Sequence, residues 1–465
     1  LTPYVTPAGA RTGTVRCEGR GVEGVVVSDG DRCAVTDAAG RFVLPANDRA
    51  RFLFVSTPAG YTSPVEQGVV RFFRPVTPRN DGYDFTLVRN TADDTRHGFA
   101  VIADPQLFDR KELRLLEGAA ADIRRTARAA EKQGRPMHGI CVGDITSGDH
   151  GFYSDYNRIL ATTGIGFRNA PGNHDMKLWG RSFERSTAAY EAVYGPSYYS
   201  YNVGLAHYVV LNDNFYIGRD WYYIGYLDER QLAWLEEDLA HVPTGSTLFV
   251  ALHIPTSFPG KEQQPFLYPQ AETSLCNFRA LHELLAPYNA HILSGHMHTA
   301  MNCEIRPNLY EHNIAALSGA WWQGPVCTDG TPAGYALFEV DGDSVTWYYK
   351  ATGKRREYQL RLYDAADDPA YAGRIVANVW DSDPAWRIEV RIDGGEPLRM
   401  EPMRGVDPLA RRLYGHPEQL DHKWITVSET DHLYAAPLPA TARRVEVTAR
   451  DRFGNVYRAE KHIKR

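Results

Sequence analysis

The chain has 465 residues, more than one ordinary hydrophobic core accommodates, so we expect two or three domains. A hydrophobic fraction of 43% and a charged fraction of 23% are typical of a globular protein. The net charge of -6 provides no overall basic field and argues against a non-specific nucleic-acid binder. No apolar run approaches the roughly 20 residues that a transmembrane helix needs, so no membrane-spanning segment is expected.

Residues 1–94 contain no helical pattern and form the first expected domain. The stretch GVEGVVVSDGDRCAVTDAAGRFVLPA alternates apolar and polar residues between Asp-Gly and Ala-Gly turns, which predicts short antiparallel strands in a small β-sandwich. Part of it also resembles the carboxypeptidase regulatory-like repeat of exported proteins. Cys17 and Cys33 fall in this segment and could pair. None of the six cysteines forms a CxxC pair, so a structural zinc knuckle is not expected.

Residues 95–352 have the alternation of an α/β domain. Apolar residues at helical spacing predict helices over residues 112–132, 228–242 and 277–288. Near-continuous apolar runs are typical of strands that other layers cover on both faces. Such runs occupy residues 98–103, 138–143, 206–212, 247–253 and 291–295.

Residues 353–465 lose the helical pattern again and predict a C-terminal β-domain. The expected strands occupy residues 374–380, 386–393, 443–451 and 455–463. Its boundary is open, because residues 334–353 could instead form the last hairpin of the α/β domain.

Polar side chains follow the apolar strands of the α/β segment, at the edge where open α/β sheets bind ligands. The residues of metal-ligand type at these strand ends are Asp104, Gln106, Asp144, Asn173, His253, His296 and His298. Taken singly, such an Asp is usually a turn or helix cap, and a lone His is more often a hydrogen-bonded core residue. The His296–His298 pair is stronger, because alternate residues of an extended segment point the same way. Their coincidence at successive strand ends favours a metal site.

These residues lie in the motifs DPQ, VGD, PGNHD, ALHIP and GHMH, between Asp104 and His298. The series resembles that of the calcineurin-like metallophosphoesterase superfamily. The resemblance implies a four-layer α/β/β/α sandwich around a two-metal centre, flanked by two all-β domains. The flanks resemble those of an exported bacterial subfamily, so a periplasmic or cell-surface protein is expected, with any export signal upstream of Leu1.

Carried over residue by residue, the resemblance places the first metal on Asp104, Gln106, Asp144 and His298. It places the second on Asp144, Asn173, His253 and His296, with Asp144 bridging. Imidazole ligands favour Zn, Fe or Mn over Mg or Ca. Gln106 stands where the family pattern has His, and its amide oxygen is a harder and weaker ligand, so the first metal is expected to bind more loosely or to favour Mn or Fe. Some members of the superfamily also carry Gln here.

The implied reaction is hydrolysis of a phosphate monoester or diester, in which a hydroxide held between the metals attacks phosphorus in line. His174 is not a ligand in this scheme. We expect it, oriented by Asp175, to give a proton or hydrogen bond to the leaving oxygen. A small-molecule or glycan- or lipid-linked phosphoester is the expected substrate, and nucleic acid is not. Two alternatives stay open: a nuclease or nucleotide phosphodiesterase with the same metals, and a non-catalytic envelope- or glycan-binding protein with a vestigial centre.

Aromatic and basic residues crowd the loops expected near the centre, in residues 176–186, 211–228 and 318–324. They could stack a sugar or base and pair with a second anionic group. The residues concerned are Lys177, Trp179, Arg181, Arg185, Arg219, Trp321 and Trp322. Packing within the domain or against the C-terminal module is the commoner use of such residues, so they are candidates only.

Overall fold

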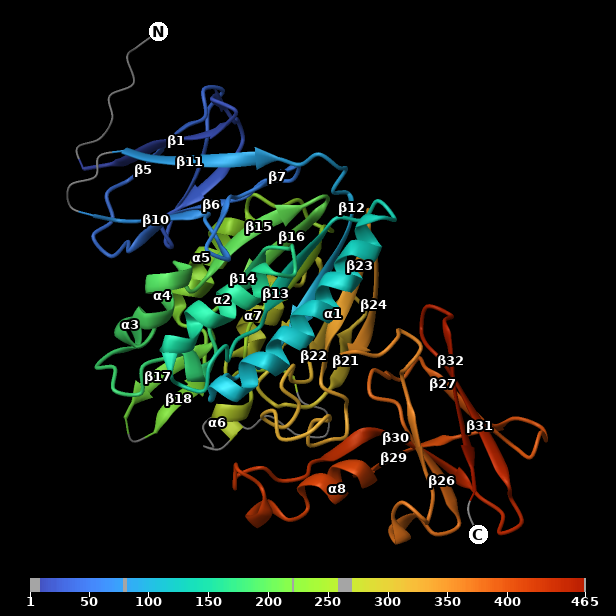
Figure 1. Cartoon of the computed structure of the whole chain (residues 1–465). Helices are drawn as coiled ribbons and strands as arrows, with labels where there is room; N and C mark the ends of the chain where they lie inside the picture. Colours follow the sequence, from blue (N-terminus) through green and yellow to red (C-terminus); the bar gives the residue numbers. More distant parts are fainter. Residues whose placement is uncertain (1–8, 78–81, 220, 258–269, 464–465) are drawn as a thin grey trace.

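The computed structural model describes residues 9–77, 82–219, 221–257 and 270–463. An α/β core lies between two β-rich parts, one N-terminal and one C-terminal (Figure 1). Within these described ranges, no helix combines the length and apolarity needed to cross a bilayer. All six cysteines are free thiols, so Cys17 and Cys33 do not form the disulfide that the sequence left open.

Two sheets form the core. The first has five strands in the order β14 (Phe167–Asn169), β13 (Met137–Cys141), β12 (Arg96–Ile102), β23 (Gly334–Asp341) and β24 (Ser344–Ala351). The second has six, in the order β15 (Tyr199–Val203), β16 (Ala206–Val210), β19 (Thr247–Ala251), β20 (Asn289–Ser294), β22 (Leu309–Asn313) and β21 (Met301–Arg306). The hairpin at residues 334–351 therefore extends the first core sheet.

The strands in the middle of both sheets are parallel, which aligns their carboxyl ends. In the first sheet β12, β13 and β14 run parallel, and in the second β16, β19, β20 and β22 do. The added strands β23, β24, β15 and β21 run antiparallel. A parallel strand needs a crossover connection, and the helices of the core supply most of these.

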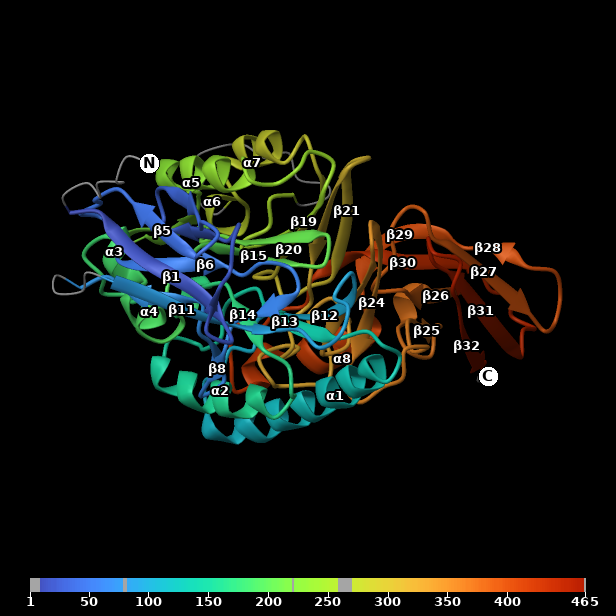
Figure 2. The ribbon, with the colours of Figure 1, turned by 90° about the horizontal axis from the view of Figure 1, so that it is seen from above.

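Helices cover the outer face of each sheet and complete four layers, which Figure 2 shows in order from α7 and α5 down to α2 and α1. The helices of these outer layers are α1 (Leu113–Glu131), α2 (Tyr153–Ala161), α5 (Glu229–Leu239) and α7 (Phe278–Leu284). This confirms the predicted α/β/β/α sandwich. The expected helices at residues 112–132, 228–242 and 277–288 are present with shorter ends, and the Asp228 side chain caps the start of α5 by accepting from the Gln231 amide.

Each layer follows from the apolar pattern of its residues. Leu116, Ala119, Ala120 and Ile123 lie on one face of α1 and pack on the first sheet. Between the sheets, aromatic rings interdigitate: the Phe99 ring lies 4.7 Å from that of Phe249 and 4.8 Å from that of Phe338, centroid to centroid.

Several short elements were not predicted. They are α3 (Phe183–Ser186), α4 (Ala188–Tyr194), α6 (Gln270–Thr273) and the hairpin of β17 (Asn214–Gly218) and β18 (Tyr222–Gly225). Of these, α3 and α6 have four residues each, too few to show a helical period.

The N-terminal part is a β-sandwich, as predicted. One sheet contains β2 (Arg20–Gly21), β1 (Arg11–Cys17), β11 (Gly82–Arg89), β7 (Tyr61–Thr62) and, beside β1, β5 (Arg41–Leu44). The other contains β10 (Phe73–Pro75), β6 (Phe52–Ser56), β3 (Val26–Ser28) and β4 (Cys33–Val35), and a small hairpin pairs β8 (Val65–Glu66) with β9 (Val69–Val70). The expectation of antiparallel strands fails at β1 and β11, which pair in parallel because several strands intervene between them.

The C-terminal part has two four-stranded sheets. One contains β25 (Arg361–Tyr363), β26 (Arg374–Asn378), β30 (Glu429–Pro437) and β29 (Glu401–Val406). The other contains β28 (Leu398–Arg399), β27 (Arg387–Ile392), β31 (Arg444–Arg450) and β32 (Val456–His462). The predicted strands are present, but this part also has one helix that the sequence analysis missed, α8 (Pro408–Tyr414), capped by Asp407.

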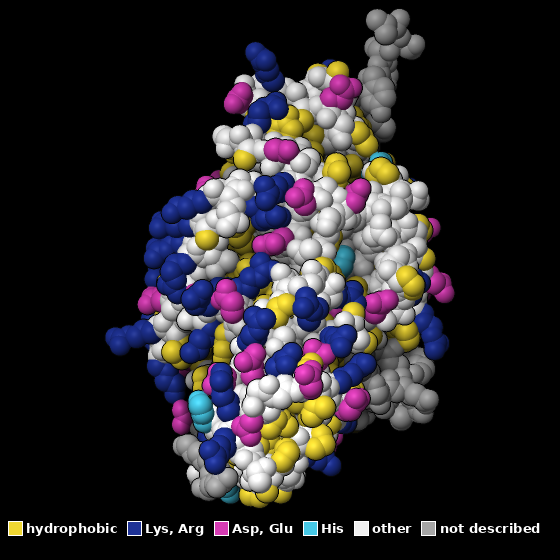
Figure 3. All heavy atoms as spheres, turned by 90° about the vertical axis from the view of Figure 1, so that its right-hand side faces the viewer, with side chains coloured by type: hydrophobic (Ala, Val, Ile, Leu, Met, Phe, Trp, Pro, Cys, Tyr) yellow, Lys and Arg dark blue, Asp and Glu magenta, His cyan; other side chains and the backbone are white. Residues whose placement is uncertain are grey.

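The surface shows charges of both signs close together over most of the face in Figure 3. Many are paired on the C-terminal part, for example Arg444 with Glu460 and Arg404 with Glu429. The mixture of charges on this face agrees with the small net charge.

Candidate metal centre

The strand ends of both core sheets meet at one place. Asp104 follows β12, Asp144 follows β13 and Asn173 lies just beyond β14, all in the first sheet. His253 follows β19, and His296 and His298 follow β20, in the second sheet. The site is thus a seam between two sheets rather than the edge of one.

Short distances connect most of these side chains. The ligand-type atoms of Asp144, His253 and His296 all lie within 4.8 Å of one another. His253 Nε2 is 3.1 Å from Asn173 Oδ1 and 3.3 Å from Asp144 Oδ2. These four residues are the set predicted for the second metal, and the structure brings them together.

The residues predicted for the first metal are linked in pairs. His298 Nε2 lies 3.4 Å from Asp104 Oδ1, and Gln106 Nε2 donates to Asp144 Oδ2 at 2.7 Å. Asp144 therefore touches members of both sets, the position that a bridging ligand requires.

Two oxygen atoms in this group are buried and accept no hydrogen bond from the described residues, although His298 Nε2 lies 3.4 Å from the first of them. They are Asp104 Oδ1 and Gln106 Oε1, the atoms that would coordinate the first metal. Because a buried carboxylate or amide oxygen is costly to leave unpaired, such orphans need a further partner. A cation meets that need, so this donor set fits a metal.

Each candidate imidazole is held through one ring nitrogen by a backbone carbonyl. His253 Nδ1 lies 2.8 Å from Val142 O, His298 Nδ1 lies 3.3 Å from Gly319 O, and His296 Nε2 lies 2.8 Å from Glu272 O. Contacts of this kind fix the tautomer and aim the other nitrogen of metal-ligating histidines. The other nitrogens of His253 and His298 face Asp144 and Asp104, and His296 Nδ1 lies 3.2 Å from His253 Nε2.

The backbone at most candidate ligands is strained. Positive φ angles occur at Asp104 (49°), Gln106 (37°), Asp144 (54°), His296 (69°) and His298 (52°). This region is sparsely populated by residues other than glycine, and each such position costs about 1–3 kcal/mol. Strain concentrated at one set of strand ends marks a functional site.

The buried charges are strongly coupled. Burial alone would raise the pKa of Asp144, but the His253 and His174 rings and the hydrogen bond with His253 hold that pKa well below its ordinary value. Burial would lower the pKa of His253, yet Asp144 raises it to about 10. Burial and the neighbouring His253 lower the pKa of His296 to about 4. A metal cation competes with the His253 proton for the same ring nitrogen.

The two predicted catalytic residues are placed differently. The His174 amide donates to Asp144 Oδ1 at 2.8 Å, which sets its half-buried ring beside the centre. The expectation that Asp175 orients the His174 ring is wrong. The Asp175 carboxylate points inward and accepts from the Gly172 and Ile145 amides and the Tyr153 hydroxyl. Burial, followed by the Asp144 charge, raises the pKa of Asp175 to about 7.

Two further contributors escaped the sequence analysis. Asp213, just beyond β16, is fully buried and accepts from the amides of His253 (3.1 Å) and Ile254 (2.8 Å), so it fixes the turn that carries His253. The strand-end pattern applied to residues 206–212 would have found it. Tyr222 has a positive φ of 63° and donates its hydroxyl to the Asn173 carbonyl.

The aromatic and basic candidates divide into two groups. Lys177, Trp179, Arg181, Arg185 and Arg219 are exposed, and the Arg219 guanidinium lies over the Trp179 ring at 3.7 Å from its centroid. Trp321 and Trp322 are half-buried and closer to the centre, since Trp321 stacks on His298.

Comparison with known families agrees with this geometry. The model of the calcineurin-like phosphoesterase matches residues 97–300. The models of the N-terminal and C-terminal parts of calcineurin-like phosphoesterases match residues 9–90 and 311–457. The chain therefore belongs to the calcineurin-like phosphoesterase family. It is a metal-dependent phosphoric ester hydrolase with both flanking extensions.

Solved structures give distant likenesses. A dimetal phosphatase from Danio rerio has 17% identity, covers 56% of this chain and 97% of its own, and has a TM-score of 0.38. The structure titled PhoD has 11% identity, with coverage of 95% and 85% and a TM-score of 0.37. A purple acid phosphatase from yellow lupin has 13% identity, with coverage of 74% and 67% and a TM-score of 0.38. At these scores they carry no argument about activity. No protein of curated function gave a significant match.

Proposed function

We propose that this protein hydrolyses phosphate esters with two metal ions. The residues that would hold them are Asp104, Gln106, Asp144 and His298 for one, and Asp144, Asn173, His253 and His296 for the other. The observation that carries the proposal is the pair of orphaned oxygens, Asp104 Oδ1 and Gln106 Oε1, facing a seam where three braced imidazoles also converge.

Metal ions bound there would lower the pKa of a water toward neutrality and offset the negative charge of the phosphoryl group. The protein supplies the rest. The Asn173 amide is a neutral ligand, so the site stays cationic toward an anionic ester. The braced imidazoles hold their geometry without reorganising during the reaction, which favours the transition state.

His174 is the residue proposed to assist departure of the alcohol. Its backbone is anchored to Asp144, so its ring stays at the rim of the centre. A protonated imidazole there can donate to the leaving oxygen and compensate its developing charge. Asp175 contributes by bracing the turn and not by orienting the ring.

The test pairs elemental analysis of the purified protein with a panel of phosphate monoesters and diesters, before and after chelation. We expect two equivalents of Mn, Fe or Zn per chain, loss of turnover on chelation, and recovery on adding metal back. Hydrolysis of monoesters alone would assign a phosphatase, and of diesters a phosphodiesterase.

Asp144→Asn makes the same test more specific. The variant keeps the side-chain shape and removes the charge that faces the candidate ligands of both metals. It should bind less than one equivalent of metal and lose turnover. Full metal content with full activity in this variant would rule out the bridging assignment. Absence of metal and of turnover in the wild type would favour the non-catalytic alternative.

A further inference from the structure

Beside the candidate metal centre, rings from separate parts of the chain form a continuous wall. The Trp321 ring is stacked on His298, with centroids 4.1 Å apart and planes 19° from parallel. Trp424, from the C-terminal part, meets Trp321 edge-on at 6.3 Å and 88°. His422 stacks on Trp424 at 4.5 Å and meets Phe108 edge-on at 5.3 Å. We call Phe108, Trp321, His422 and Trp424 the aromatic wall.

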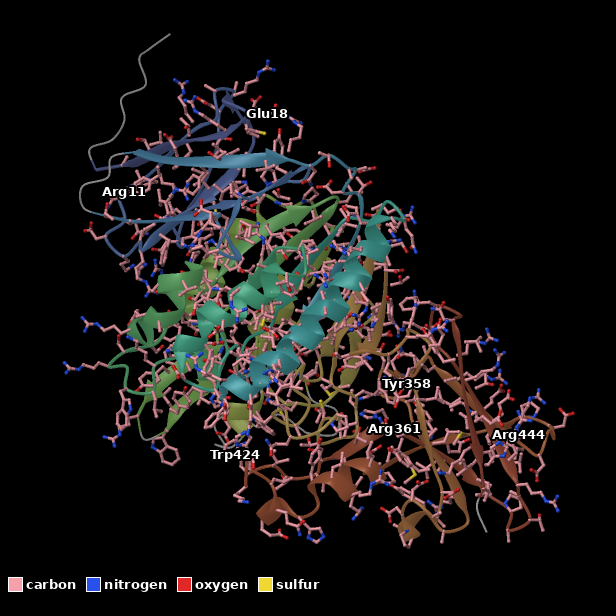
Figure 4. The ribbon with its side chains drawn as sticks, viewed as in Figure 1. Arg11, Glu18, Tyr358, Arg361, Trp424 and Arg444 are labelled. Carbon is pink, nitrogen blue, oxygen red and sulfur yellow. The ribbon has the colours of Figure 1, made fainter. Side chains whose placement is uncertain are left out.

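The segment that brings His422 and Trp424 to this place is anchored to the core. Asp421 accepts from Lys111 Nζ at 3.0 Å, and its amide donates to Gln323 Oε1, also at 3.0 Å. The next residue after Trp424 is buried in an apolar cluster that joins α8 to the core; the cluster contains Ala320, Val326, Ala410, Tyr414 and Ile425. Figure 4 shows Trp424 at the lower end of the core in that view, where the C-terminal part reaches it.

The outer rings of the aromatic wall stay open to solvent in spite of this anchoring. Phe108 is 54% exposed and Trp424 is 56% exposed. Single exposed apolar residues are ordinary, but these two belong to one connected set of rings that ends on a candidate metal ligand. A fixed, exposed aromatic surface next to a reactive centre is suited to binding.

The inner end of the aromatic wall is strained. Trp321 and Trp322 have positive φ angles of 48° and 60°. The Trp322 indole N–H donates to Pro105 O at 2.8 Å. This hydrogen bond joins the turn at Trp321 and Trp322 to the turn that carries the candidate ligands Asp104 and Gln106. Non-glycine residues keep such angles only where the surroundings enforce them, and they cluster at ligand sites.

Three polar groups beside the aromatic wall are already paired within the protein, so the exposed ring faces are its main contact surface. The Trp322 indole is bonded to Pro105, Asp421 to Lys111, and Gln323 to the Asp421 amide. A sugar needs several convergent donors and acceptors, whereas a planar aromatic ring needs only faces and edges to stack on.

We propose that the aromatic wall binds a planar aromatic ring carried by the ester group of the substrate, while the phosphoryl group occupies the metal centre. The proposal rests on the function proposed above and extends it to a substrate class, aryl phosphoesters or nucleotides. It also assigns a role to the C-terminal part, which supplies His422 and Trp424.

Trp424→Ala tests the aromatic wall through specificity. We expect the ratio of kcat/KM for phenyl phosphate to kcat/KM for methyl phosphate to fall about tenfold, mainly through KM, because stacking on one ring is lost. Trp424→Phe should restore most of the ratio. Leu398→Ala, which removes another exposed apolar side chain of the C-terminal part, should leave both values unchanged. An unchanged ratio in Trp424→Ala would overturn the proposal.

Binding provides a readout that does not need turnover. Calorimetry should show tighter binding of phenylphosphonate than of methylphosphonate to the metal-loaded wild type, and a loss of that preference in Trp424→Ala. If the wild type hydrolyses neither ester, the proposed function fails. The preference for phenylphosphonate over methylphosphonate still shows whether the aromatic wall binds an aromatic ring. Equal binding of the two phosphonates to the wild type would overturn the proposal for the aromatic wall. A nucleoside monophosphate in the same assay distinguishes nucleotides from aryl phosphoesters as the substrate class. Tighter binding than that of phenylphosphonate indicates a nucleotide, and weaker binding indicates a simple aryl ester.

Discussion

His174 is fixed through its backbone while its ring makes no hydrogen bond to any residue in the described ranges. That arrangement suits a group that must transfer a proton and then recover it. For His174→Ala we expect turnover of an alkyl phosphate to fall by about 10²–10⁴, since a poor leaving group depends on proton donation. Turnover of 4-nitrophenyl phosphate should fall much less, with metal content unchanged. Steady-state kinetics on both esters, with elemental analysis, measures this.

His241→Ala is the matched control for His174→Ala, because His241 is exposed between α5 and the start of β19, whereas the candidate ligand His253 follows the other end of that strand. It should leave both activities intact. An equal loss of both substrates in His174→Ala would show that the residue supports the site without donating to the leaving oxygen.

The turns after the parallel strands depend on glycine where the chain passes close to the candidate ligands, and Gly143 is one such position. Gly143 has a φ of 100°, and a Cβ there would lie 2.7 Å from His253 Nδ1. Gly148 has the same φ of 100°, with nothing within 4 Å of its Cβ position. Gly148→Ala therefore reports backbone strain alone, about 1–3 kcal/mol. Gly143→Ala adds displacement of the His253 ring, so we expect metal affinity about 10–100-fold weaker in this variant only.

Denaturant unfolding and metal titration of the two glycine variants separate strain from displacement. If Gly148→Ala weakened metal binding as much as Gly143→Ala, backbone strain and not the position of His253 would govern the affinity.

The elements that carry the site were predictable because their information is local. An apolar run followed by Asp, Asn or His is visible in a few residues, and the strands β12, β13, β19 and β20 end where those runs end. The contacts that aim the ligands were not predictable, since Glu272 O and Gly319 O reach His296 and His298 from distant segments. Asp175 shows the same limit: its place in the motif gave no indication that its carboxylate turns inward.

At the scale of the whole molecule, the N-terminal sandwich and the core share buried surface. Phe54, Phe72 and Phe73 of the N-terminal part belong to the same apolar cluster as the core sheets. The Trp234 indole of α5 donates to Ser28 Oγ at 3.1 Å, which joins the two parts by a buried hydrogen bond. Because residues of the sandwich pack in the hydrophobic core of the α/β domain, the sandwich is not expected to unfold independently.

Phe42→Ala tests this coupling, because Phe42 is 2% exposed and lies in the separate cluster of the sandwich. The substitution should remove about 3–5 kcal/mol. All nine tryptophans lie between residues 179 and 424, outside the sandwich, so their fluorescence follows the core and the C-terminal part, with Trp234 also in contact with the sandwich at Ser28. We expect Phe42→Ala to lower the fluorescence midpoint in denaturant together with the circular-dichroism midpoint. Val88→Ala, which alters a 50% exposed side chain of the same sandwich, should shift neither. If Phe42→Ala left the fluorescence midpoint unchanged, the sandwich would unfold alone and the core that carries the candidate metal centre would stay folded without it.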